Sequence, residues 1–319
     1  MKRIIIIGLC ILSVFAYGGC KWQGKQEKPE PGAPGQQMTA PGVEPTISVY
    51  MHETGEKKDM KMEEYIAGVV AGEMRNDWPV EALAAQAIVA RSFTVYQIET
   101  KGGVKERGTQ ASTDIKEFQA YSAKDINDNV RKAVAMTRGM IMVYQGKPAY
   151  TWFHASAGGK TATAKEGLNY REAEPPYIQS VDSPDDASAP PEVRSWDAAF
   201  SQADVIKALD QLGKKVSDIS SVEIAQRGPS GRTTTLKFNG DTDVSGPDFR
   251  VAIGSTKLRS MLLNNVKVAG GQIIFSGKGF GHGVGLSQYG ALTMAKEGKK
   301  PEEIVTHYFT GVTVEKRWQ

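Results

Sequence analysis

A glutamate on the apolar side of an expected helix is the residue best placed for acid–base chemistry. Apolar residues recur at helical spacing over residues 63–74. The same spacing puts Glu73 on one stripe with Ile66 and Val70. Desolvation raises the pKa of a carboxyl group, and a glutamic acid that keeps its proton near neutral pH suits general acid catalysis. A structural carboxylate at a helix end, paired with an arginine, is the equally weighted alternative.

An arginine on the next expected helix also lies on a packing face. Over residues 80–99 the helical spacing puts Arg91 on one stripe with Ala87 and Val95. A guanidinium there needs a specific partner, and the two candidates are the Glu73 carboxylate and a substrate oxygen. Pairing with Arg91 would lower the pKa of Glu73 and oppose a general acid role.

Two further segments carry polar groups beside glycines. His154 and Ser156 end an expected strand just before two glycines, although a histidine on a strand is more often a core residue than a catalyst. Glycine then occupies every second position from Gly277 to Gly285, ahead of the polar run Ser287, Gln288 and Tyr289. An extended segment would line these glycines along one side as a bare binding floor. A tight strand packed against a neighbour is the structural alternative.

Several familiar kinds of site are excluded. The glycine-rich segment lacks the P-loop ending and the dinucleotide fingerprint, and Ser287 is not in a nucleophile elbow. The whole chain has 4 His and 2 Cys, and one of those cysteines is Cys10 in the apolar N-terminal run, so a metal cage is poorly supplied. A formal charge of +3 over 319 residues does not indicate nucleic acid as a partner.

The N-terminus predicts export and attachment to the cell membrane. A positive start and a short apolar run precede Cys20, which is typical of a lipoprotein signal with Cys20 acylated; an uncleaved signal anchor over 1–20 is the alternative. Residues 21–46 are rich in Pro, Gly, Gln and Glu and predict a disordered tether. We therefore expect one catalytic domain, 47–319, outside the cytoplasm and anchored to the membrane.

The pattern of elements predicts an α+β fold, with N-terminal helices packed against a mostly antiparallel sheet. Strand-like alternation opens the domain, helical spacing follows, and β-prone segments dominate later. Helices are expected over 63–74, 80–99, 126–137 and 202–212. Strands are expected over 47–52, 140–144, 149–154, 222–226, 233–238 and 272–275, with a surface loop over 170–196.

These segments together resemble the stage II sporulation protein D family, over nearly all of the chain from about Ile47. The matching stretches are 64–74, 81–91, 154–161, 245–250, 259–260, 279–291 and 308–311. The resemblance implies that Glu73 is the catalytic residue. It also implies a substrate-binding groove lined by Arg91, His154, Ser156, Gly281, His282, Ser287, Gln288 and Tyr289. Because Phe118 and Ala157 stand where zinc-binding relatives can carry cysteines, we expect no metal and no cofactor.

The resemblance further implies a lytic transglycosylase that cuts denuded peptidoglycan glycan strands during forespore engulfment, with a partner amidase and engulfment membrane proteins. Glu73 would protonate the oxygen between N-acetylmuramic acid and N-acetylglucosamine, and the sugar's own 6-hydroxyl would close a 1,6-anhydro ring. A non-catalytic glycan binder that enhances a cell-wall amidase is the main alternative. A purely structural tethered lipoprotein is a third.

Overall fold

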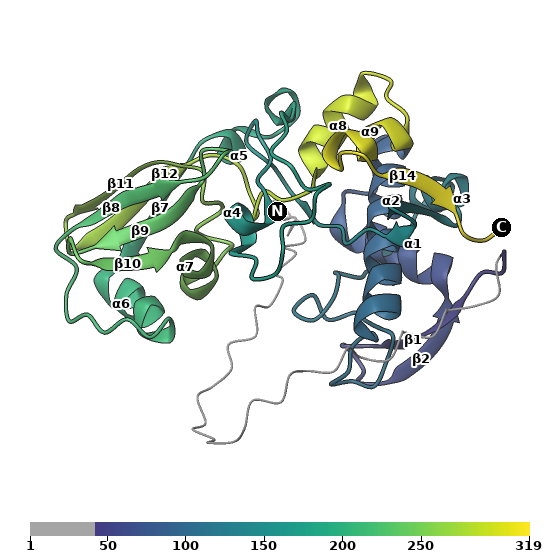
Figure 1. The fold of residues 1–319 in the computed structure, drawn as a ribbon, viewed down its shortest axis with the longest axis horizontal. Coiled ribbons are helices and arrows are strands. Elements are labelled where there is room, and N and C mark those ends of the chain that lie inside the picture. The colour runs from purple at the N-terminus through teal and green to yellow at the C-terminus, as the bar shows by residue number, and fades with distance from the viewer. Residues whose placement is uncertain (1–41) are drawn as a thin grey trace.

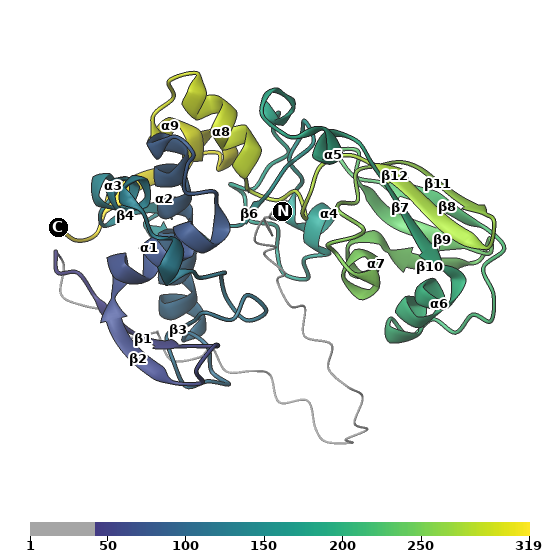
Figure 2. The same cartoon turned by 180° about the vertical axis from the view of Figure 1, so that it is seen from behind.

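The structure is a computed structural model that describes residues 42–319, and in both views these residues gather into two lobes (Figures 1 and 2). The expected signal, Cys20 and most of the expected tether lie outside the described residues. None of the helices within residues 42–319 is long and apolar enough to cross a membrane. The α+β class is confirmed, with several small sheets in place of one large one.

The first lobe is built around a helix that is buried along most of its length. This helix, α2 (Val80–Tyr96), starts after Pro79, and its many alanines let neighbouring helices approach closely. Around it lie α1 (Met62–Glu73), α3 (Asp128–Met136), α8 (Gln288–Lys296) and α9 (Pro301–Tyr308). Two sheets flank the helices. One contains β1 (Thr46–Tyr50), β2 (Lys57–Lys61) and β3 (Ala111–Ser112), and the other contains β4 (Met140–Tyr144), β5 (Lys147–Pro148) and β14 (Thr313–Lys316).

The second lobe has its own sheets, helices and hydrophobic core. One sheet has the order β11 (Leu263–Ala269), β12 (Gln272–Gly277), β7 (Trp196–Ser201), and all its pairs are antiparallel. The other has the order β10 (Thr242–Ser245), β9 (Thr233–Phe238), β8 (Val222–Arg227). Helices α6 (Gln202–Gln211) and α7 (Gly246–Ile253) pack together beside them. A cluster that includes Phe200, Phe249 and Phe275 is separate from the core of the first lobe.

The second lobe is an insertion in the first. The core of the first lobe takes residues from both ends of the chain, including Ile47 and Trp318. The inserted segment enters on β7 and returns on β12, where Trp196 pairs with Gly277. Short elements lie between the lobes: β6 (Phe153–His154), α4 (Ala164–Leu168), α5 (Pro191–Arg194) and β13 (Leu286–Ser287). Within the single domain predicted over 47–319, each lobe thus has a large hydrophobic cluster of its own.

Most predicted elements are present, and three predictions are wrong. The stretch predicted as a surface loop over 170–196 contains α5 and buried residues such as Ile178 and Asp185. The strand predicted over 149–154 is reduced to Phe153 and His154. The tether predicted to run to residue 46 ends earlier, because Gly42 already forms a bridge with Trp318 and Thr46 pairs with Lys61 in β1. Residues 42–46 contain little to bury, which is why composition alone assigned them to the tether.

Candidate functional site

Glu73 is the last residue of α1, and its carboxyl group is almost completely buried. Its side chain is 1% exposed, as the apolar stripe predicted. One oxygen, Oε1, accepts a hydrogen bond from the backbone N–H of Ala120 at 2.7 Å, whereas Oε2 has no partner within the described residues. Burial raises the pKa of Glu73 to about 8, and the Ala120 hydrogen bond lowers it by less. The group therefore keeps its proton at neutral pH.

The polar run after the glycines lies directly against Glu73. Gln288 Nε2 donates a hydrogen bond to the Glu73 backbone carbonyl at 3.1 Å. The next residue, Tyr289, is bound to the segment that follows β6: its backbone N–H donates a hydrogen bond to Ala155 O at 2.9 Å. Its ring lies 5.2 Å from the ring of Trp78. Two segments far apart in the sequence thus meet at one place.

The segments that carry His154 and Ser287 form a short parallel pair. In this pair β6 lies against β13, with His154 opposite Ser287. Ser287 caps α8 by accepting from Gly290 N, and its hydroxyl donates to the buried carboxylate of Asp185. The same carboxylate accepts from Ala157 N at 2.9 Å. Ser287 therefore has a structural role, in which it fixes the turn after Ser156.

His154 and His282 lie together, with ring centroids 5.6 Å apart, and both are buried. His154 Nδ1 faces the carbonyl of Val284 at 3.1 Å, so Nδ1 carries the hydrogen and the unpartnered Nε2 carries a lone pair. His282 Nδ1 accepts from Val284 N at 3.0 Å. Burial lowers the pKa of His154 well below its usual range. The pKa of His282 is lowered to about 3, mainly by burial and then by the positive charges of Arg250 and Arg232. Both imidazole rings are therefore neutral.

The glycine run is not the bare binding floor that an extended segment would make. Gly281, Gly283 and Gly285 have φ of +112°, +87° and +71°, a left-handed conformation that no strand uses. A Cβ on Gly281 would lie 2.6 Å from His154 Cβ, and one on Gly285 would lie 2.1 Å from Trp152 O. The prediction was wrong because the missing side chains make room for neighbouring chain segments. The structural alternative is right about this close packing, but the segment between Gly277 and Leu286 is not a strand.

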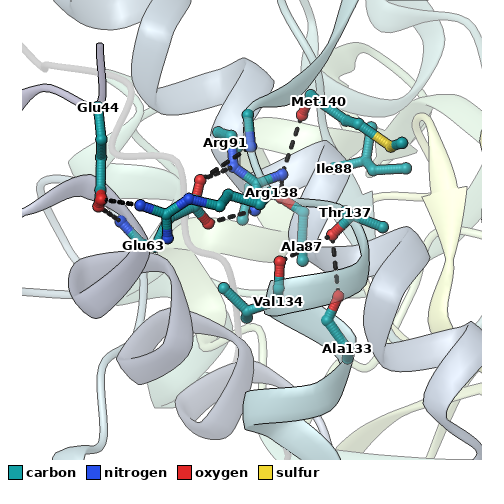
Figure 3. A network of polar contacts seen from close by, with 12 residues as sticks. Glu44, Glu63, Ala87, Ile88, Arg91, Ala133, Val134, Thr137, Arg138 and Met140 are labelled. Carbon is teal, nitrogen blue, oxygen red and sulfur yellow. Dashed lines mark hydrogen bonds and ion pairs between the residues drawn. The ribbon is translucent and has the colours of Figure 1, made fainter. Parts of the chain in front are cut away.

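Arg91 is not part of this site. The guanidinium is completely buried and forms an ion pair with Glu63, with Nη2 2.6 Å from Oε2 (Figure 3). Glu63 Oε1 also accepts from Gly139 N at 3.0 Å and Trp318 Nε1 at 2.8 Å. The expectation that Arg91 pairs with Glu73 or with substrate was wrong, because Glu63 stands at the other end of α1. The ion pair joins α1, α2 and the C-terminal residues.

Buried residues that sequence reasoning missed complete the region between the lobes. Arg232 comes from β8–β9 of the second lobe, and its guanidinium donates to Ala157 O and Lys160 O, both at 2.7 Å. Asp185 lies inside the stretch predicted as a surface loop, yet it is completely buried. Neither residue stands in a repeated pattern, so only the fold reveals them. Within residues 42–319, no group of three or more His, Cys, Asp or Glu side chains is placed to hold a metal ion.

The fold and the site define a two-lobed α+β protein with one protonated, buried glutamic acid close to the junction of the lobes. Comparison with known proteins agrees with this description. A family model described as Stage II sporulation protein matches residues 50–144, within the first lobe. A domain of unknown function matches residues 170–285, which include the whole second lobe.

Two curated relatives share most of the chain. Stage II sporulation protein D of Bacillus amyloliquefaciens is 35% identical, over 86% of this chain and 81% of the relative. The protein of the same name from Bacillus subtilis (strain 168) is 33% identical, over 84% and 78%. An amidase enhancer of Bacillus subtilis is 28% identical over 78% of this chain but only 40% of its own length. The chain belongs to the stage II sporulation protein D family.

Proposed function

We propose that the protein is a lytic transglycosylase that cleaves the bond between N-acetylmuramic acid and N-acetylglucosamine in denuded peptidoglycan strands. The observation that carries the proposal is the state of Glu73: a carboxyl group with a pKa of about 8 and an oxygen, Oε2, without a partner. A protonated oxygen with no acceptor is ready to donate to a glycosidic oxygen.

One carboxyl group is enough for this reaction. The Glu73 proton passes to the glycosidic oxygen as the bond to the muramic acid C1 breaks, which leaves an oxocarbenium-like sugar. The 6-hydroxyl of that sugar then bonds to C1, and its proton returns to the Glu73 carboxylate. Burial raises the pKa of Tyr289 above its usual 10, so the phenol stays neutral and is a poor base for this step. The product is a 1,6-anhydro sugar, and no second carboxylate is needed to hold a water molecule.

Substrate must displace part of the cover over Glu73, because only 1% of this residue is exposed. The segment directly bonded to the carboxyl group is the one that carries Ala120. Moving that segment would break the hydrogen bond to Oε1 and open the acid to a bound strand. Opening would also reduce the burial that raises the pKa of Glu73, so the carboxyl group would give up its proton more readily once the strand is in place.

Isolated denuded strands and the Glu73→Gln variant test the proposal. Wild-type protein should release products with 1,6-anhydro ends, detected by mass spectrometry, and Glu73→Gln should release none. Glu64→Gln is the matched control, since Glu64 lies on the same helix but is exposed and should keep full activity. Ordinary reducing ends from the wild type would show a hydrolase, and equal cleavage by Glu73→Gln would remove Glu73 from the mechanism.

A second candidate function is enhancement of a cell-wall amidase by glycan binding alone. Its support is the similarity to a protein named as an amidase enhancer, together with the nearly closed cover over Glu73. In that case neither wild type nor Glu73→Gln would cleave glycan, and both would raise amidase activity equally. We further propose that either activity serves forespore engulfment, beside engulfment membrane proteins; the support is that the chain belongs to a sporulation family.

We also propose that the protein is exported and held at the cell membrane through its N-terminus. The support is the signal-like start of the sequence and Cys20, which lie outside the described residues. The intact mass of the membrane-extracted protein separates a chain acylated at Cys20 from one that keeps residues 1–20. A full-length, unmodified chain in the soluble fraction would contradict both forms.

A further inference from the structure

A small group of aromatic side chains gathers where α5, α8 and the segment after Glu73 meet. Tyr289 packs there with Val193 of α5, and Trp78 and Phe280, both partly exposed, pack against this cluster. Trp78 follows Glu73 by a few residues, and Tyr289 follows Gln288, which holds the Glu73 carbonyl. Two of the rings thus belong to segments that pass close to the backbone of the proposed acid.

The backbone of two of these aromatic residues is bound to one stretch of chain. Phe280 exchanges hydrogen bonds with Ser156, both 2.9 Å long, and Tyr289 N donates to the neighbouring Ala155 O. Adjacent residues of a single segment thus hold both Phe280 and Tyr289. Trp78 completes the set, with its ring tilted by 53° to that of Tyr289. The partly exposed faces of Trp78 and Phe280 are suited to stack on the apolar faces of sugar rings.

A cation stands at the edge of this cluster. The Arg259 guanidinium lies 5.8 Å from the centre of the Phe280 ring, and its Nη1 donates to the Glu192 carbonyl. Its backbone carbonyl accepts from Gly281 N and Arg250 Nε, which fixes the residue in place. Within residues 42–319, no carboxylate lies within ion-pair distance of Arg259. By contrast, the nearby Arg75 is paired with Asp77 at 2.6 Å. Arg259 therefore keeps a charge that an anionic ligand could neutralise.

We propose that Trp78, Phe280 and Arg259 form a binding platform for a sugar that carries a free carboxylate. The rings hold the pyranose, and the guanidinium binds the carboxylate. In a glycan strand, this is the lactyl carboxylate of a muramic acid residue whose stem peptide has been removed. A stem peptide converts that carboxylate into a neutral amide, so Arg259 would favour denuded strands. The inference rests on the proposed function for its choice of glycan.

Binding measured without cleavage tests the platform by itself. In the Glu73→Gln background, denuded strands should bind about tenfold more tightly than strands whose carboxylates have been reduced to alcohols. Adding Arg259→Gln should abolish this preference, and Arg259→Lys should keep part of it. Adding Trp78→Ala should weaken binding of both kinds of strand. Arg131→Gln, which removes an exposed arginine on α3, is the matched control and should change nothing.

Thermal unfolding checks that each variant is folded before its binding is measured. Equal binding of the two kinds of strand by the Glu73→Gln protein would overturn the proposal, and so would a preference that survives Arg259→Gln. If the predicted preference is found but wild-type protein cleaves nothing, the platform stands and the transglycosylase proposal fails. The two proposals can therefore fail separately.

Discussion

Gln288 donates a hydrogen bond of 3.1 Å to the backbone carbonyl of Glu73, although 215 residues separate the two in sequence. The whole second lobe lies between them along the chain. The end of α1 and the start of α8 are thus held together. Residues that precede the inserted lobe in the sequence and residues that follow it both contact Glu73. The stability and the chemistry of the site are therefore coupled.

The buried carboxyl group should make stability depend on pH. The pKa of Glu73 is about 8 in the folded protein and 4.5 ordinarily, so between these values only the unfolded chain is ionised. The contribution of Glu73 to stability is full below pH 4.5 and falls as the pH rises towards about 8, by at most about 1.4 kcal/mol per pH unit. Glu73→Gln should lack this loss, as urea unfolding at several pH values would show. A parallel pH dependence in Glu73→Gln and wild type would contradict the raised pKa.

The buried histidines should act in the opposite direction. The pKa of His282 is about 3, below the ordinary 6.5, so the unfolded chain takes up a proton first as the pH falls. The contribution of His282 to stability should be full above pH 6.5 and decline as the pH falls towards about 3. His282→Gln should flatten this acid limb of the unfolding curve, whereas His307→Gln, which removes an exposed histidine, should leave it steep. If His282→Gln loses stability at acid pH as steeply as the wild type, groups other than His282 cause the decline.

The Arg91–Glu63 ion pair should be needed for stability and not for chemistry. Arg91→Met leaves the Glu63 carboxylate buried without its cation, which should destabilise the protein by about 3–5 kcal/mol. The half-exposed pair of Arg138 with Glu44 provides the control, since Arg138→Met should cost about 1 kcal/mol. Folded Arg91→Met protein should bind glycan as the wild type does. Normal stability with weakened binding would return Arg91 to the substrate site.

The glycine run should tolerate no side chain. Gly285→Ala places a Cβ against Trp152 O at a φ of +71°, and should cost about 3 kcal/mol or more. Gly271 has nearly the same φ, +72°, but nothing within 4 Å of its added Cβ, so Gly271→Ala should cost about 1 kcal/mol. The difference in unfolding free energy measures the contact alone. Similar losses in both variants would mean that the space beside Gly285 is open.

Local periodicity was enough to predict the main helices and the burial of Glu73. The apolar stripe of α1 is a property of neighbouring residues, and the structure confirms that Glu73 lies on its buried side. Strands β4 and β9 also fall where β-prone residues predicted them. In these cases a segment's own pattern agrees with the place it takes in the fold.

Partners that are distant in sequence could not be predicted in this way. Glu73 and a substrate oxygen were the two candidate partners for Arg91, but the orientation of α2 against α1 brings Glu63 to it instead. The glycines were counted as an extended strand, because alternation alone does not show a left-handed φ or a neighbour such as Trp152. The buried Asp185 resembles any acidic loop residue until the turn that it fixes is known.

The pairing of Trp196 with Gly277 means that the inserted lobe starts and finishes at one point on the molecule. Further contacts hold the base of that lobe against the junction: Arg232 donates to Ala157 O and Lys160 O, and Ser230 donates to Glu166 of α4. Arg259, which precedes β11 on the inserted side, is therefore positioned relative to the Glu73 carboxyl group by the fold itself. Under the proposed function, the length of a muramyl unit that fits between acid and cation is thus set before the strand binds.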